Sequence, residues 1–589
     1  MLAGVPWHQL LPSQLPWTLP RYNYIPAHTQ SAMTSTESIP DVVVDIDAPG
    51  PPISVPDSGE GGEGGKLKMI VALVKKSLGV KDIAAMRLSL PASLLEPIPN
   101  LEYWHYLDRP DLFAAINDSE DPFERMLAVL RFAFTKDLKF IHGKICKPYN
   151  SVLGEHFRSH WDVVPAQPHP DPAQPPILRL NTSFDPAADA SDVALSPGGA
   201  ETASMRSGVS VSSVGTASMK RNSTSANGKS PSTAATSLDA DAVAAQMSQL
   251  SLAEDEERVR VVYMTEQVSH HPPVSAYHAV CPARGLTLAG IDQISAKVSG
   301  TTLRVAPGAH NKGIFVRIAG TNENGEGVRG AGEEYHITHP IASVNGILRG
   351  SFYLTVGDST VVTCTGGKGD EWYRAVVEYK EESWLGRAQY RMEGVVHTYK
   401  KGETAHEGWT KVRDVPKARV VAEFDGCWRN KIRWRKVAAT PSYSAPNATS
   451  QSSVKSGKSS NSSIFEPTEY TTLLDLSTVY PIPKTVRALD KQLPYESRKL
   501  WSDVTDRLVK KEFGEATKAK LSIEQRQRDQ AAERKRTGAE FTPLYFEKDI
   551  SSGVPTLTEE GHKAIAEELA EPSPFCLESH SGDVTPSES

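Results

Sequence analysis

Residues 257–437 alternate between apolar and polar side chains, as strands do when only one face is buried. The clearest alternating runs are residues 258–261, 373–379 and 432–437. Glycines and the Asn-Gly pairs at 324–325 and 345–346 interrupt this region at intervals typical of hairpins. A long antiparallel sheet loses its exposed edges most easily by curling into a barrel. We therefore predict a barrel-like antiparallel sheet at the centre of an α+β chain.

Helical periodicity occurs on both sides of this region. Within residues 66–78, apolar positions at helical spacing are separated by lysines: Leu67, Ile70, Val71, Val74 and Leu78, with Lys68, Lys75 and Lys76. This segment fits either an ordinary packed helix or an amphipathic lid whose lysines favour anionic lipid. Residues 88–97 are strand-like, whereas residues 122–138 and 495–535 are typical of helices.

Four stretches have too few large apolar side chains to fold: residues 1–65, 174–256, 438–464 and 551–589. We expect a disordered N-terminus, two disordered insertions and a disordered tail. The remaining blocks are then expected to form one large domain over residues 66–550, because long surface insertions cost little closure entropy. No segment before residue 65 is expected to fold as a separate targeting domain.

Charge and cysteine content narrow the class of protein. The net charge is −7 with mixed signs, so no global field favours nucleic acid. The five cysteines lie far apart without a Cys-x-x-Cys pair, which indicates reduced thiols in the cytosol. The apolar run 69–74 is much shorter than the roughly 20 residues that span a bilayer. We expect a cytoplasmic protein that meets intracellular membranes only peripherally.

Residues 266–273, Glu-Gln-Val-Ser-His-His-Pro-Pro, join two imidazoles to two prolines. Proline lacks a backbone N–H and restricts the preceding residue, so a ladder strand should not continue through Pro272 and Pro273. A rigid turn would then present His270 and His271, whose ring nitrogens can donate to an anion such as phosphate. The alternative is a pair of buried, hydrogen-bonded core histidines.

A second segment, residues 147–157, reads Lys-Pro-Tyr-Asn-Ser-Val-Leu-Gly-Glu-His-Phe. Lys147 offers a point charge and Asn150 a donor–acceptor amide, and both suit a phosphate. Pro148 stiffens the chain beside the lysine. The alternative is a surface turn with an incidental lysine.

A third segment places Lys520, Glu524 and Arg528 at i, i+4 and i+8, on one helix face over about 12 Å. Arginine can bind phosphate oxygens with two parallel hydrogen bonds. Such a triad is also typical of a solvated, salt-bridged helix face.

These three segments resemble signature segments of the oxysterol-binding-protein-related family. The second departs from the family pattern at Ser151, where the family has a proline, so its turn should be slightly looser. The resemblance implies an incomplete antiparallel β-barrel around an apolar lipid tunnel, with an N-terminal helical lid and a C-terminal helical region. It also implies a lipid-headgroup site that contains Lys147, Asn150, His270, His271, Lys520, Glu524 and Arg528.

The same resemblance implies exchange of phosphatidylinositol 4-phosphate for a sterol between membranes. One branch of the family carries phosphatidylserine instead, and residues 98–102 match neither ligand pattern clearly. A lipid sensor without net transport is the third alternative. The expected partners are these lipids and, transiently, a membrane surface.

Three short patterns that suggest enzymes lack the context for catalysis. Cys427 and Arg433 have the spacing of a cysteine phosphatase loop, but the loop lacks small residues and continues into an alternating strand. The glycines of 325–330 precede a strand-like run instead of a helix, and 366–368 is not followed by Ser or Thr. No metal-ligand spacing occurs. We predict no enzyme activity, no cofactor and no metal.

Overall fold

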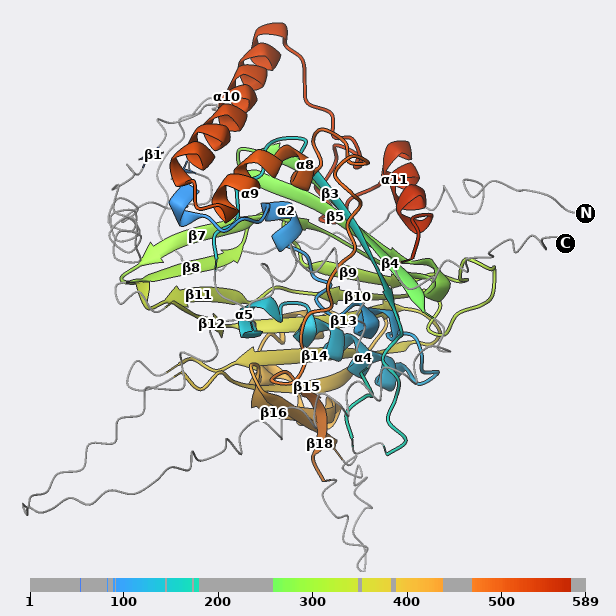
Figure 1. The fold of residues 1–589 in the computed structure, drawn as a ribbon. Coiled ribbons are helices and arrows are strands. Elements are labelled where there is room, and N and C mark those ends of the chain that lie inside the picture. The colour runs from blue at the N-terminus through green and yellow to red at the C-terminus, as the bar shows by residue number, and fades with distance from the viewer. Residues whose placement is uncertain are drawn as a thin grey trace, which may run out of the picture. The chain divides into compact units, whose positions relative to one another are not determined.

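Among the residues that the structure describes, twelve strands form one sheet in the computed structural model (Figure 1). In spatial order they are β18 (Thr471–Asp475), β17 (Lys431–Lys436), β16 (Val420–Cys427), β15 (Arg391–Lys400), β14 (Glu371–Tyr379), β13 (Ser359–Gly366), β10 (Glu333–Ile337), β9 (Ile314–Ile318), β6 (Leu286–Asp292), β5 (Pro273–Cys281), β4 (Val259–His270) and β3 (His156–Val163). Neighbouring strands are antiparallel throughout. The end strands β3 and β18 do not pair with each other, so the predicted incomplete antiparallel barrel is confirmed.

The described residues are 53–54, 82, 88–90, 92–142, 146–171, 174–178, 258–347, 352–382, 388–437 and 469–573. The predicted lid at 66–78 lies outside them, as do residues 179–256 and 438–464 of the two predicted insertions. The alternating runs named above coincide with strands β4, β14 and β17, except that residues 258 and 437 lie just outside β4 and β17.

A second sheet of four strands continues several of these strands beyond sharp bends. Its order is β12 (Tyr353–Gly357), β11 (Ile341–Asn345), β8 (Thr302–Pro307) and β7 (Ile294–Ser299). One residue separates β6 from β7, and one separates β12 from β13. The chain therefore passes from one sheet to the other without a long connection.

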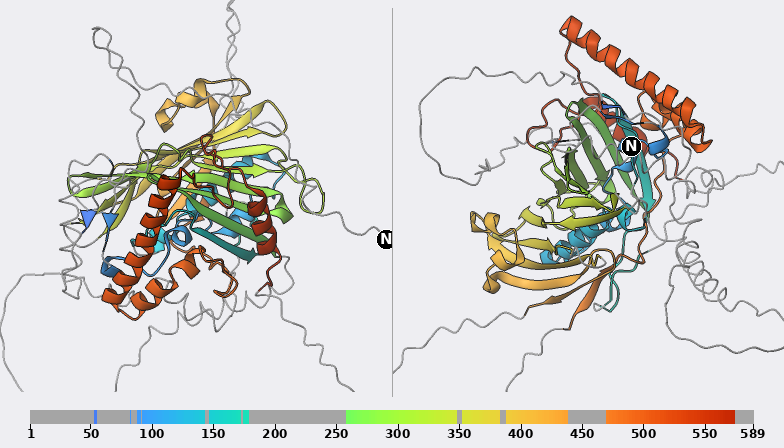
Figure 2. Two further views of the ribbon diagram at one scale, coloured as in Figure 1. Left: turned by 90° about the horizontal axis from the view of Figure 1, so that it is seen from above. Right: turned by 90° about the vertical axis from the view of Figure 1, so that its left-hand side faces the viewer.

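Helices from the N-terminal part lie on the concave side of the large sheet. They are α2 (Asn100–Tyr103), α3 (Pro110–Ala114), α4 (Pro122–Thr135) and α5 (Lys139–His142). Helix α4 begins where the Asp121 carboxylate accepts the backbone N–H of Phe123 at 2.9 Å. Its apolar side chains share one buried cluster with strands from β3 to β17. Figure 2 shows the sheet curving around this helix. The helix predicted at 122–138 is confirmed.

The C-terminal part supplies α8 (Ser497–Leu500), α9 (Ser502–Val509), α10 (Phe513–Thr537) and α11 (Glu559–Leu569). Helices α9 and α10 pack together over a second apolar cluster that includes Leu90, Tyr149 and Trp501. The prediction of a strand over 88–97 holds only for β2 (Leu88–Ser89), because the chain turns into a short 3-10 helix, η2 (Ala92–Leu94), after Pro91.

Three of the stretches expected to be disordered contain secondary structure where the structure describes them. In the N-terminal stretch, β1 (Ile53–Ser54) pairs in parallel with β2. In the first insertion, Ile177 forms a bridge with Gln167. In the tail, α11 packs Ala564 and Ile565 against β4, and the Thr558 hydroxyl caps its first turn by accepting the Gly561 N–H at 3.1 Å. A few apolar side chains and one N-cap allow α11 to form here, because strand residues supply the rest of the apolar cluster on which it packs.

No helix in the described part of the chain is both long enough and apolar enough to cross a bilayer.

Candidate lipid-headgroup site

Lys147 and Asn150 form the first part of the candidate site. The Lys147 ammonium donates to the Asn150 side-chain oxygen at 2.7 Å and to the Pro148 carbonyl at 3.0 Å. Burial and, secondly, the charge of Lys520 lower the pKa of Lys147 to about 8. The two ammonium groups therefore lie close enough to interact, although 373 residues separate them in sequence.

The packing of Tyr149 explains why the Lys147 segment meets α10. The Tyr149 ring stacks at 4.9 Å from Trp501, and its hydroxyl lies 3.0 Å from the Thr505 hydroxyl of α9. Ala92, from the neighbouring segment, donates its N–H to Thr517 of α10 at 3.2 Å. Because α9 and α10 pack on the same apolar cluster, Lys147 and Lys520 are brought to one end of the fold.

Lys520, Glu524 and Arg528 differ in their surroundings along α10. The Lys520 side chain is only 3% exposed and donates to the Glu524 carboxylate at 2.5 Å. Arg528 is exposed, and its guanidinium donates twice to the Gln525 side-chain oxygen, at 3.0 and 2.8 Å. The structure thus brings Lys520 near Lys147, with Glu524 paired to Lys520, whereas Arg528 lies two turns farther along the helix.

His270 and His271 lie at the turn between β4 and β5, with ring centroids 4.5 Å apart. Strand β4 ends at His270, as the prolines predict, although Pro273 is the first residue of β5. The backbone of the second segment runs beside this turn, because Gly154 N–H donates to the Gln267 carbonyl at 3.0 Å. The histidine turn and the Lys147 segment therefore share one edge of the sheet.

Glu155 is a supporting residue to which sequence analysis assigned no role. Its carboxylate accepts from the Val152 N–H at 3.0 Å, the Ser497 hydroxyl at 2.7 Å and the Trp501 indole at 3.0 Å. Burial raises its pKa to about 7, against the lowering effect of these donors. Glu155 thus fastens the Lys147 segment to α8 and to Trp501. The sequence signal for Glu155 is its place within the same segment, residues 147–157, as Lys147 and Asn150.

Glu266 has a similar role at the start of the histidine octapeptide. Its two oxygens accept the backbone N–H groups of Leu544 and Tyr545, each at 2.7 Å. Burial raises the pKa of this carboxyl to about 7 as well. The chain that follows α10 is therefore tied to β4, four residues before His270.

The enzyme-like patterns have structural roles in the described residues. Cys427 ends β16 and Arg433 lies on β17, where its guanidinium pairs with Asp425 of the same hairpin at 2.6 Å. The glycine-rich run 325–330 leads into strand β10 and not into a helix. Neither segment has the geometry of a phosphate-binding loop.

Comparison with known proteins gives the family. The family described as "Oxysterol-binding protein" matches residues 69–167 and 250–568, more than half of the chain. The chain belongs to the oxysterol-binding protein family. A relative from Schizosaccharomyces pombe, "Oxysterol-binding protein-like protein 1", is 38% identical over 86% of this chain and 92% of its own length. "Oxysterol-binding protein homolog 7" from Saccharomyces cerevisiae is 27% identical over 49% of this chain and 53% of its own length.

Solved structures similar to this oxysterol-binding protein family member carry lipids. The Osh1 ORD domain in complex with cholesterol is 18% identical, covers 85% of this chain and 89% of its own, and gives a TM-score of 0.48. The Osh3 ORD in complex with PI(4)P from Saccharomyces cerevisiae is 14% identical, covers 86% of this chain and 95% of its own, and gives a TM-score of 0.45.

Proposed function

We propose that this protein exchanges phosphatidylinositol 4-phosphate for a sterol between membranes. The observation that carries the proposal is the proximity of the Lys147 and Lys520 ammonium groups. Burial and, secondly, the charge of Lys520 lower the pKa of Lys147 to about 8. Two like charges held together favour binding of an anion. A phosphomonoester of about −1.5 to −2 charge at neutral pH would relieve their repulsion.

The proposed headgroup site adds five further side chains to this lysine pair. Asn150 and Glu524 already contact the two lysines, and Glu524 can accept from inositol hydroxyls. His270 and His271 donate from the adjoining turn. Arg528 reaches the phosphate by turning away from Gln525, because both of its present hydrogen bonds go to that one exposed amide.

The apolar part of the lipid is proposed to lie on the concave side of the sheet, near α4. Burying a few hundred Å² of lipid at about 25 cal/mol per Å² provides roughly 10 kcal/mol. Only an enclosed apolar tunnel supplies that area, so the tunnel remains part of the proposal. We propose a cytoplasmic protein that contacts membranes peripherally and acts by transfer, without catalysis.

Mass spectrometry of lipids that copurify with the protein tests the ligand assignment. We expect phosphatidylinositol 4-phosphate and a sterol; phosphatidylserine in place of the sterol would assign the chain to the other exchange reaction. A transfer assay between two vesicle populations then tests transport. Movement of phosphatidylinositol 4-phosphate in one direction and sterol in the other supports exchange. Binding of both lipids without net movement would show that the protein is a sensor.

A further inference from the structure

Helix α10 carries an exposed basic stripe that extends beyond the candidate headgroup site. Residues at alternating spacings of three and four share one helix face. We call them the α10 stripe: Lys518, Leu521, Gln525, Arg528, Ala532 and Lys535, together with the adjoining Arg536. Every member is exposed, and the stripe extends over about 27 Å of helix. It contains four cations in a chain whose net charge is −7. Two of them pair with carboxylates at its border, Lys518 with Glu515 at 2.7 Å and Arg536 with Glu533 at 2.5 Å.

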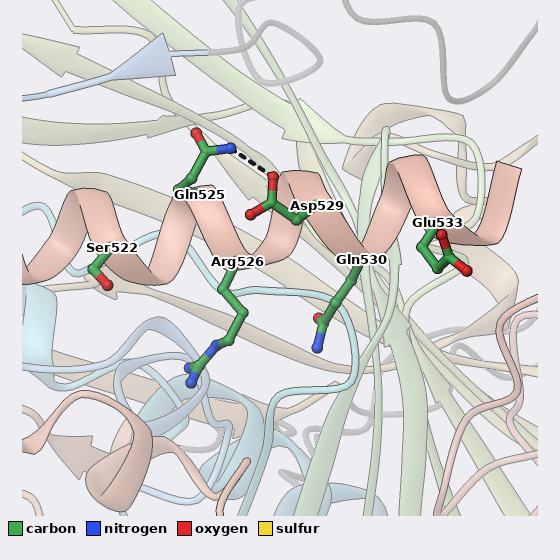
Figure 3. A pocket seen from close by; sticks show the side chains of 6 residues that line it. All are labelled: Ser522, Gln525, Arg526, Asp529, Gln530 and Glu533. Carbon is green, nitrogen blue, oxygen red and sulfur yellow. Dashed lines mark hydrogen bonds between the residues drawn. The ribbon is translucent and has the colours of Figure 1, made fainter. Parts of the chain in front are cut away.

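The opposite face holds the helix against the rest of the fold. Gln530 donates to the Tyr495 hydroxyl at 2.7 Å, and the Arg526 guanidinium lies 5.9 Å from the centre of the same ring. Figure 3 shows Arg526 and Gln530 projecting to one side of α10, whereas Gln525 and Asp529 project to the other. Asp529 borders the stripe and accepts a hydrogen bond from Gln525 at 2.7 Å. The stripe therefore lies on the face of α10 that points away from these packing contacts.

Helix electrostatics alone do not explain this pattern. Cations in the last turn, such as Lys535 and Arg536, stabilise the negative end of the helix dipole. That effect fades within one turn, so it does not account for Lys518 or Arg528, which lie two or more turns away. The exposed Leu521, 43% accessible, adds an apolar side chain among the cations.

We propose that the α10 stripe docks on an anionic lipid bilayer. A long, nearly flat face with basic residues, one exposed leucine and a small residue, Ala532, has the chemistry of an interfacial helix. The inference rests on the proposed function, because Arg528 belongs to both the stripe and the headgroup site. Docking on this stripe places α10, the helix that also carries Lys520, at the membrane from which a headgroup is extracted.

The test measures partition of the full chain between buffer and vesicles of phosphatidylcholine, with or without phosphatidylserine. The stripe variant is Lys518→Gln/Lys535→Gln, which changes neither the fold's apolar contacts nor a headgroup residue. Its matched control is Lys548→Gln/Lys563→Gln, which removes two exposed lysines from elsewhere on the surface. Each lysine near an anionic surface contributes about 1 kcal/mol, so partition onto phosphatidylserine vesicles should fall roughly ten- to thirtyfold in the stripe variant only.

A soluble short-chain phosphatidylinositol 4-phosphate separates docking from headgroup binding. The stripe variant should bind this lipid as the unmodified protein does. Unchanged vesicle partition in the stripe variant, an equal loss in the control, or a parallel loss of short-chain binding would each overturn the docking proposal. If the unmodified protein binds no short-chain lipid while the stripe variant still loses partition, docking stands and the proposed headgroup site is wrong.

Discussion

Two charged regions of this fold use opposite arrangements of side chains. In the candidate site, Lys520 pairs with Glu524, whereas Lys147 donates to an amide oxygen and a backbone carbonyl. Burial and, secondly, the charge of Lys520 lower the pKa of Lys147. Beneath α11, buried cations are balanced by carboxylates. Arg158 pairs with Glu496 at 3.3 Å, and Glu496 also pairs with Arg487. The balanced region is built to hold strands and helices together, whereas the unbalanced region favours an added anion.

The balanced network joins four distant parts of the chain: β3, β4, residues 487–496 and α11. Glu568 of α11 accepts from His160 of β3 at 2.8 Å and pairs with Arg487 at 3.4 Å. Arg260 of β4 donates to the last carbonyls of α11, those of Glu568 and Leu569, at 3.2 and 3.0 Å. It thereby satisfies groups that a helix end leaves unpaired. The network therefore stabilises α11 on the sheet.

Breaking the balanced network should give the largest effect. In Glu496→Gln, Arg158 and Arg487 lose their shared buried carboxylate but keep their pairs with Glu567 and Glu568. The free energy of unfolding should therefore fall by about 3 kcal/mol, the lower end of the range for breaking a buried pair. Urea denaturation measures this change. The exposed carboxylate Glu533 pairs only at the surface, so Glu533→Gln should change stability by no more than about 0.5 kcal/mol. Equal losses of stability in the two variants would show that the buried pairs stabilise the fold no more than the exposed pair does.

Removing the two imidazole side chains at the β4–β5 turn should affect ligand binding more than folding. His270→Ala/His271→Ala deletes two donors to the phosphate, each worth about 1.5–3 kcal/mol, so affinity for phosphatidylinositol 4-phosphate should fall roughly a hundredfold or more. The second lipid should still bind. Lipid extraction from vesicles measures both, with His169→Ala/His562→Ala as the control. Normal phosphoinositide extraction by the first variant would show that the histidines have another role.

Raising the pH should weaken headgroup binding in a smaller, graded way. In the proposed site Lys147 binds phosphate as a cation, so affinity should fall as pH rises through its pKa of about 8. Its unfolded pKa is about 10.4, so the unfolded chain holds more protons between about pH 8 and 10. Stability should therefore increase with pH across this window. Titrations and urea melts at several pH values measure the two trends, and both should flatten in Lys147→Met.

The sheet and α4 could be predicted from sequence because their signals are local. Period-two alternation in residues 373–379 and helical spacing in residues 122–138 are visible without any partner. Helix α11 was missed because few of its side chains are apolar, and part of its anchoring comes from polar contacts. Glu567 and Glu568 pair with Arg158 and His160 of β3, and Arg260 of β4 donates to the last carbonyls of the helix. Such pairs join residues far apart in sequence, and no periodicity reveals them.

The candidate site was predicted in part. The family resemblance identified Lys147, Asn150, Lys520 and Glu524 as candidates. The proximity of the Lys147 segment to α10, however, depends on the packing of Tyr149 against Trp501, which is a tertiary contact. The supporting carboxylates of Glu155 and Glu266 were missed, because their partners are mostly backbone N–H groups and residues of distant helices. The roles of all seven proposed ligands remain predictions.

The pKa of Lys147, measured by NMR on lysine-labelled protein, tests the central claim most directly. Without lipid it should be about 8, and the Lys520→Gln variant should raise it by removing the neighbouring charge. Short-chain phosphatidylinositol 4-phosphate should also raise it in the unmodified protein, because the phosphate stabilises the ammonium form. A Lys147 pKa near 10.4 in lipid-free protein that neither Lys520→Gln nor lipid changes would contradict the account.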